Sequence, residues 1–125
     1  MESCVFNGDN LETTLHLGIF INDNLIGICS FFKNTHPNIK EIPQYQLRGM
    51  AVLKAFQGKG LGKIILKHGE AALKTKNVKK IWCNAREIAV PFYKKNNYEI
   101  GSKPFNIKEI GTHYMMHKTL FYNTL

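Results

Sequence analysis

The chain has 125 residues, a length that suits one domain with a single core, residues 1–125, and excludes two independent cores. Hydrophobic residues make up 44%, and no apolar run reaches the ~20 residues of a membrane-spanning helix. The N-terminus lacks the basic start and apolar core of a signal peptide, so we expect a cytoplasmic protein without a membrane partner. The formal net charge of +8 favours an anionic partner without identifying it.

The first half of the chain predicts three strands. Residues 15–33 hold two apolar runs around Asn22-Asp23-Asn24, and these residues tolerate the left-handed backbone of a tight hairpin turn. Residues 34–44 are polar, contain two prolines and indicate a loop. Residues 45–53, YQLRGMAVL, alternate loosely and predict a strand that ends just before a glycine-rich segment.

The second half predicts helices between strands. Apolar residues recur at three and four positions from Leu61 and predict an amphipathic helix to about residue 76. Residues 79–85 predict a short buried strand, and residues 88–96 a short helix, with Pro91 near its start. Two closing strands follow, at 98–107 and 113–121. This order implies an α/β or α+β fold, with a mixed central sheet that has antiparallel flanks and helices against it.

The segment QGKGLGK, residues 57–63, lies between a predicted strand and a predicted helix. Glycines let a backbone curl tightly and direct its N–H groups, together with the helix N-terminus, at an anion. Two familiar phosphate motifs fail here. A P-loop would need glycine at Gln57 and a hydroxyl residue at Ile64. A dinucleotide loop starting at Gly58 would need a small residue at Lys63.

A third pattern fits the same residues. Gln57, two free positions, Gly60, one free position and Gly62, after the strand residues MAVL, resemble the acyl-CoA pyrophosphate loop of the GCN5-related N-acetyltransferase (GNAT) family. About forty residues later, AVPFYKKNNYEIG resembles the family segment in which a tyrosine on a short helix precedes a turn and an aromatic residue. Two ordered motifs are far more specific than one glycine loop. The chain is similar to small bacterial members of this family.

The resemblance implies acetyl-CoA as cosubstrate, without a metal, in a mostly antiparallel sheet with a shortened N-terminal region. The pyrophosphate would lie on backbone amides of the loop, with the Gln57 side chain as a brace and two lysines at the rim. Backbone groups at the end of the preceding strand would pair with the pantetheine arm, and one amide would polarise the thioester carbonyl. The implied cofactor-binding residues are Met50, Ala51, Val52, Gln57, Gly58, Lys59, Gly60, Leu61, Gly62 and Lys63.

Tyr93 matches the family tyrosine that gives a proton to the departing thiolate. The implied reaction is direct transfer of the acetyl group to an amine. Polyamines, aminoglycosides, amino acids and protein amines all remain open as acceptors. An asparagine that many relatives carry seven residues before this tyrosine is replaced by Arg86, with Asn84 two positions earlier.

Two features leave alternatives open. Relatives usually place a strand and two helices before the hairpin, where this chain has about fourteen residues. The acceptor pocket is then unusually open, completed by a second subunit, or missing, and the last case would make the chain a non-catalytic CoA-binding or regulatory module. Glu41, Glu70 and Glu109 are candidate general bases, and spacing does not select one.

Other residue patterns indicate structural roles. Cys4, Cys29 and Cys83 are odd in number and lack C-x-x-C spacing, so we expect small core side chains. Of the five histidines, only His113 and His117 are spaced as a pair, and on a strand they lie too far apart to chelate a metal easily. The basic residues are not interleaved with an aromatic series, so we do not expect specific nucleic-acid binding.

Overall fold

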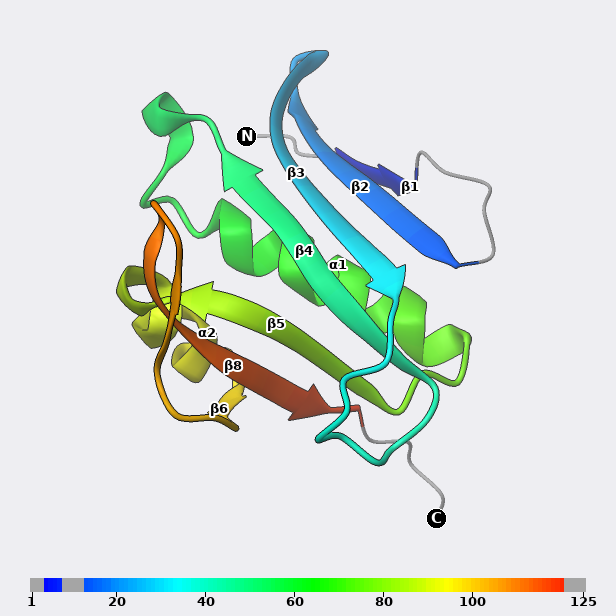
Figure 1. Cartoon of the computed structure of the whole chain (residues 1–125). Coiled ribbons are helices and arrows are strands. Elements are labelled where there is room, and N and C mark those ends of the chain that lie inside the picture. Colours follow the sequence, from blue (N-terminus) through cyan, green and yellow to red (C-terminus); the bar gives the residue numbers. More distant parts are fainter. Residues whose placement is uncertain (1–3, 8–12, 121–125) are drawn as a thin grey trace.

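A computed structural model of the chain describes residues 4–7 and 13–120 (Figure 1). All eight strands join one sheet in the order β1-β2-β3-β4-β5-β8-β6, with β7 also paired to β8. The strands are β1 (Cys4–Asn7), β2 (Thr14–Ile21), β3 (Asn24–Lys33), β4 (Gln44–Val52), β5 (Lys80–Arg86), β6 (Glu99–Ile100), β7 (Phe105–Ile107) and β8 (Gly111–Thr119). The helices are η1 (Lys54–Phe56), α1 (Leu61–Thr75), η2 (Glu87–Ala89) and α2 (Val90–Lys95), of which η1 and η2 are 3-10 turns.

The pairing is mixed, as predicted. The pairs β1–β2, β2–β3 and β3–β4 are antiparallel. The pair β4–β5 is parallel, and the pair β5–β8 is antiparallel. The β2–β3 hairpin turns at Asn22 and Asp23, which adopt the expected left-handed backbone (φ 50° and 66°). The parallel β4–β5 pair requires a crossover, and α1 supplies it. Among the described residues no helix precedes β2, and none is long and apolar enough to cross a membrane.

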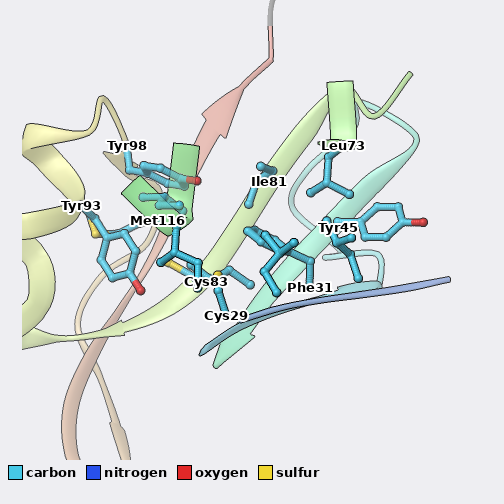
Figure 2. Packing of buried hydrophobic residues seen from close by; sticks show 14 of the residues in the cluster. Cys29, Phe31, Tyr45, Leu73, Ile81, Cys83, Tyr93, Tyr98 and Met116 are labelled. Carbon is cyan, nitrogen blue, oxygen red and sulfur yellow. The ribbon is translucent and has the colours of Figure 1, made fainter. Parts of the chain in front are cut away.

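The core lies between the sheet and α1, on what we call the inner face. α1 crosses this face against β2, β3 and β4 (Figure 1), and it buries Leu61, Ile65, Leu66, Gly69, Glu70 and Leu73. Figure 2 shows the side chains that meet there, among them Phe31, Ile81 and Met116. The free thiols Cys29 and Cys83 are buried in this cluster as expected, while the side chain of Cys4 lies outside the description.

The opposite, outer face of the sheet is covered only in part. The loop between β3 and β4 covers the β5–β8 half, where Ile39, Trp82 and Met115 form a small cluster. Trp82 Nε1 donates to Asn34 O at 2.9 Å and fixes the loop to the sheet.

Two predicted elements differ in detail. The first closing strand, predicted as continuous over 98–107, is divided into β6 and β7, because Pro104 has no N–H to donate. Ser102 Oγ accepts the Met115 N–H at 2.9 Å in place of a backbone carbonyl. The helix predicted at 88–96 begins as the turn η2 and continues as α2, with Pro91 in its first turn as expected.

Gly69 lets α1 approach the sheet, and its replacement tests that packing. A Cβ at Gly69 would lie 2.3 Å from Phe31 Cε1, so we expect Gly69→Ala to lower the free energy of unfolding by about 2 kcal/mol. Gly49→Ala is the matched control, because a Cβ there meets nothing within 4 Å. Urea denaturation of both variants measures the difference; equal stabilities would contradict this packing.

Candidate functional site

The site begins where β4 and β5 separate. The two strands pair only at their first three residues, Gln44–Gln46 with Lys80–Trp82, and then diverge (Figure 1). The end of β4 therefore has a neighbour, β3, on one side only. Among the described strands, none pairs with β4 on the other side beyond Gln46, so the backbone edge at the end of β4 could pair with an extended ligand.

The register shows which backbone groups face the gap. Leu53 N–H donates to Ile26 O at 2.8 Å, and hydrogen-bonded pairs alternate along an antiparallel ladder. The N–H and C=O of Ala51 therefore point at β3, whereas those of Met50 and Val52 point at the gap. The sequence suggested that Met50, Ala51 and Val52 all offer backbone groups to a ligand. The backbone groups of Ala51 instead face its partner Ile28 on β3.

The glycine loop has the geometry that its sequence suggested. Gly58 (φ 79°) and Gly60 (φ 78°) have a left-handed backbone, which side chains with a Cβ rarely adopt. Gln57 Nε2 donates to Val52 O at 2.9 Å, so the side chain braces the loop against the end of β4. Gly60 is the N-cap of α1, and no side chain caps that end.

The N–H groups at the start of α1 point out of the helix. The first helical hydrogen bond runs from Ile64 N to Gly60 O at 3.2 Å, so the amides of Leu61, Gly62 and Lys63 precede the helical ladder. Together with the helix dipole they form a site of positive potential that favours an anion.

A pocket of about 390 Å³ lies between the glycine loop, the first turn of α1, and α2. Phe56 and Phe92 are apolar parts of its wall, and Lys63 and Lys95 are its cationic side chains. No carboxylate of the described residues lines it. The sequence did not single out Phe92, Lys95 or Asn96, since this segment joins the loop only through the fold, nor Phe56, which directly precedes the loop. Lys59 does not line the pocket; its Nζ lies 5.6 Å from the Phe56 ring centroid.

Tyr93 does not line this pocket, although its α2 neighbours Phe92 and Lys95 do, and 9% of its surface is exposed. Figure 2 shows its hydroxyl directed toward the side of the cluster where Cys29 and Cys83 lie. Burial, and then the two nearby thiols, raise the pKa of Tyr93 above its ordinary range. The phenol is therefore neutral and carries its proton at neutral pH. Tyr98 packs edge-on against it at 5.5 Å.

A buried carboxylate anchors Tyr98. The Tyr98 hydroxyl donates to Glu70 Oε2, and Lys118 Nζ donates to Glu70 Oε1, each at 2.9 Å. Desolvation and the Glu70 charge raise the pKa of Tyr98 well above its usual value. Glu70, a candidate base in the sequence, is thus enclosed on the inner face as a structural group.

The other expected residues lie apart from the pocket. Glu41 pairs with Lys80 at 2.9 Å, near the end where β4 and β5 are still joined, and this hydrogen bond lowers the pKa of the carboxyl. Glu109 is exposed in the turn before β8. Asn84 and Arg86 are exposed on β5, on the side of its strand opposite the core residues Cys83 and Ala85.

The fold and the pocket together define an α/β protein that presents a helix N-terminus and a free strand edge to one anionic ligand. A family model described as the acetyltransferase (GNAT) family matches residues 3–98. The chain is 38% identical over 120 residues to the uncharacterized N-acetyltransferase YitI of Bacillus subtilis (strain 168), with 96% of this chain and 80% of that protein covered. The chain belongs to the GNAT family, which confirms the predicted acyltransferase class.

Solved structures share the fold at low sequence identity. The PaiA N-acetyltransferase of Thermoplasma acidophilum, in complex with coenzyme A, matches with a TM-score of 0.70 and 20% identity over 86% of this chain. This chain spans 61% of that protein. An aminoglycoside 6'-N-acetyltransferase complexed with coenzyme A matches with a TM-score of 0.75 and 13% identity, over 89% of this chain and 75% of that one. The predicted mixed, mostly antiparallel sheet flanked by helices is confirmed.

The raised pKa of Tyr93 predicts a loss of stability in alkali. An unfolded phenol ionises near pH 10, whereas folded Tyr93 keeps its proton there, so the free energy of unfolding falls as pH rises beyond about 10. Tyr93→Phe removes one such group and should reduce this slope by about 1.4 kcal/mol per pH unit. Urea denaturation from pH 8 to 11, run in parallel on both proteins, measures the slope; identical slopes would show that Tyr93 ionises freely.

Proposed function

We propose that this chain transfers the acetyl group of acetyl-CoA directly to a primary amine. The observation that carries the proposal is the joint position of the glycine loop and the diverging strands. The anion site at the start of α1 and the free edge at the end of β4 meet at Val52, which lines the pocket. Acetyl-CoA has the matching parts, a pyrophosphate followed by an extended arm with amide groups.

The pocket suits the pyrophosphate. The amides of Leu61, Gly62 and Lys63 point toward an anion, and Lys63 and Lys95 add charge that no lining carboxylate offsets. α1 and α2 lie close together at Gly62, where a Cβ would be in ordinary van der Waals contact with the Phe92 ring at 3.5 Å. The coenzyme A complexes of the two similar structures support the same donor here.

The arm would continue along the free edge of β4 as an added strand. Met50 and Val52 direct N–H groups into the gap, while Val52 O is already bonded to Gln57. An arm that runs back from the loop reaches Val52 first and Met50 second. We therefore assign the Met50 N–H to the thioester carbonyl, where it stabilises the negative charge that develops on that oxygen.

Tyr93 would protonate the sulfur. The amine nitrogen forms a bond to the acetyl carbon and loses one proton to solvent, and the carbon–sulfur bond breaks. The departing thiolate takes a proton from the phenol, which regains one from solvent. A phenol with an ordinary pKa near 10 already holds its proton at neutral pH, and burial, which raises the pKa of Tyr93, keeps it there. The acceptor is a primary amine of undefined class, and the open gap beside β4 on the outer face is its route.

Gly60→Pro tests the donor site. Proline fixes φ near −65° where the loop has +78° and removes an N–H, so we expect acetyl-CoA affinity to fall at least about tenfold. Glu109→Pro is the matched control, since it imposes a similar backbone change (φ 68°) on an exposed turn outside the pocket. Isothermal calorimetry measures both affinities. A wild-type chain that fails to bind acetyl-CoA would refute the proposal.

An acceptor panel with free-thiol detection tests the transfer itself. The panel contains spermidine, kanamycin, glycine, n-propylamine, hydroxylamine and a peptide with a free N-terminus. Thiol release with any of them supports the transferase. Acetyl-CoA binding without release from any amine would favour a non-catalytic CoA-binding module.

Tyr93→Phe separates chemistry from binding. We expect kcat to fall about 100-fold while acetyl-CoA affinity stays near normal, because the change removes only the proton donor. Tyr45→Phe, which removes a buried phenol at the closed end of β4, is the control and should retain its kcat. Equal kcat values for Tyr93→Phe and wild type would remove this tyrosine from the mechanism.

A further inference from the structure

Three residues form a row across the outer face of the sheet. His16 on β2 is paired in register with Ser30 on β3, and Ser30 is paired with Gly49 on β4. His16 Nδ1 lies 2.7 Å from Ser30 Oγ, and all three residues are half-buried. The row runs toward the free edge of β4, where Met50 follows Gly49.

Gly49 leaves room between Ser30 and that edge. A Cβ built at Gly49 would meet nothing within 4 Å, so the space over β4 on the outer face is open. Neighbouring strands lie about 4.8 Å apart. An amine placed over Gly49 would therefore lie about one strand spacing from Ser30 on β3 and about as far from a pantetheine arm paired with the free edge of β4. An acceptor amine that enters from the outer face occupies this space.

His16 is the one side chain of this row that can act as a base. β2, β3 and β4 contain no Asp or Glu, and His16 is their only histidine. Of the carboxylates considered above, Glu70 is enclosed on the inner face and Glu41 is bonded to Lys80. An imidazole is the side chain that most often acts as a general base.

We infer that Ser30 and His16 form a relay that removes a proton from the acceptor amine. The ammonium group donates an N–H to Ser30 Oγ, the Ser30 hydroxyl passes its proton to His16 Nδ1, and the neutral amine attacks the thioester. This first proton passes from the nitrogen to the imidazole and from there to solvent. The nitrogen loses a second proton to solvent once its bond to the acetyl carbon has formed, and that loss balances the proton that Tyr93 gives to sulfur and regains from solvent. This inference rests on the proposed function, because it supplies the base for that reaction.

Two side chains on the outer face lie beside the relay. His16 meets the Phe32 ring edge-on at 5.5 Å, and Arg48 Cζ lies 5.8 Å from the centroid of the same ring. Phe32 fixes the imidazole plane, so Nδ1 keeps its direction toward Ser30. His16 thus acts through Ser30 and does not itself touch the acceptor.

Two amines of different basicity test the relay. n-Propylamine is protonated at neutral pH, as a lysine side chain with a pKa near 10 is, and must lose a proton before it attacks. Hydroxylamine is a much weaker base and is already neutral. We expect His16→Gln to lower the single-turnover rate with n-propylamine about 100-fold at neutral pH and to leave the hydroxylamine rate nearly unchanged.

Two substitutions of Ser30 test whether its hydroxyl is needed. Ser30→Ala should reproduce the loss with n-propylamine, and Ser30→Thr, which keeps a hydroxyl, should restore most of the rate. His68→Gln, a change at an exposed histidine of α1, is the control. In His16→Gln the n-propylamine rate should also rise with pH in proportion to the free amine. Equal losses with both amines, or no loss with either, would overturn the relay.

The outcomes distinguish this inference from the proposed function. Calorimetry with acetyl-CoA on every variant shows whether the donor site is intact. If the wild-type chain binds no acetyl-CoA or releases thiol with neither amine, the proposed function fails. If the wild type is active and His16→Gln matches it with n-propylamine, only the relay fails.

Discussion

The separation of β4 from β5 is the constraint on which the rest of the structure depends. A parallel pair that holds only at Gln44–Gln46 and Lys80–Trp82 leaves backbone groups of the β4 end without a strand partner. Unpaired N–H and C=O groups are costly when buried, so such an edge persists only where water or a ligand reaches it. The loop and α1 follow directly from this edge in the chain. The short segment 53–60 therefore fixes the start of α1 relative to the strand edge.

Packing behind this edge makes the opening rigid. Gly69 brings α1 against Phe31, and Glu70 on the same helix bonds both Tyr98 and Lys118. The C-terminal strand β8 and the segment after α2 are thus connected to the helix that carries the anion site. A buried charge with two partners is expensive to break, so these contacts stabilise the position of Tyr93 relative to the glycine loop.

Local sequence signals predicted most of the fold, and tertiary register determined what they missed. The hairpin turn, the start of α1 and the short helix at Pro91 follow from residues within a few positions of each other. The pocket residues Phe92 and Lys95 are far in sequence from the loop that they face, so no local pattern reveals them. The His16–Ser30 pair shows the limit most clearly. The hairpin turn pairs Ile21 with Asn24, and a regular ladder continued from that pair would place His16 opposite Cys29. The bulge between Ile19 and Phe20 shifts the register by one residue, so that His16 lies opposite Ser30.

The two faces of the sheet divide the proton chemistry of an acetyl transfer. The reaction needs an acid that gives a proton to the sulfur and a base that takes a proton from the amine. If the acid and the base were adjacent, the proton would pass directly from one to the other. Tyr93, the proposed proton donor, is buried on the inner face, where a low dielectric raises the pKa of its phenol. His16 is half-buried on the outer face, where water can remove the proton that it accepts. The sheet lies between them, and the gap beside β4 is where an acetyl carbon would be reached from both sides.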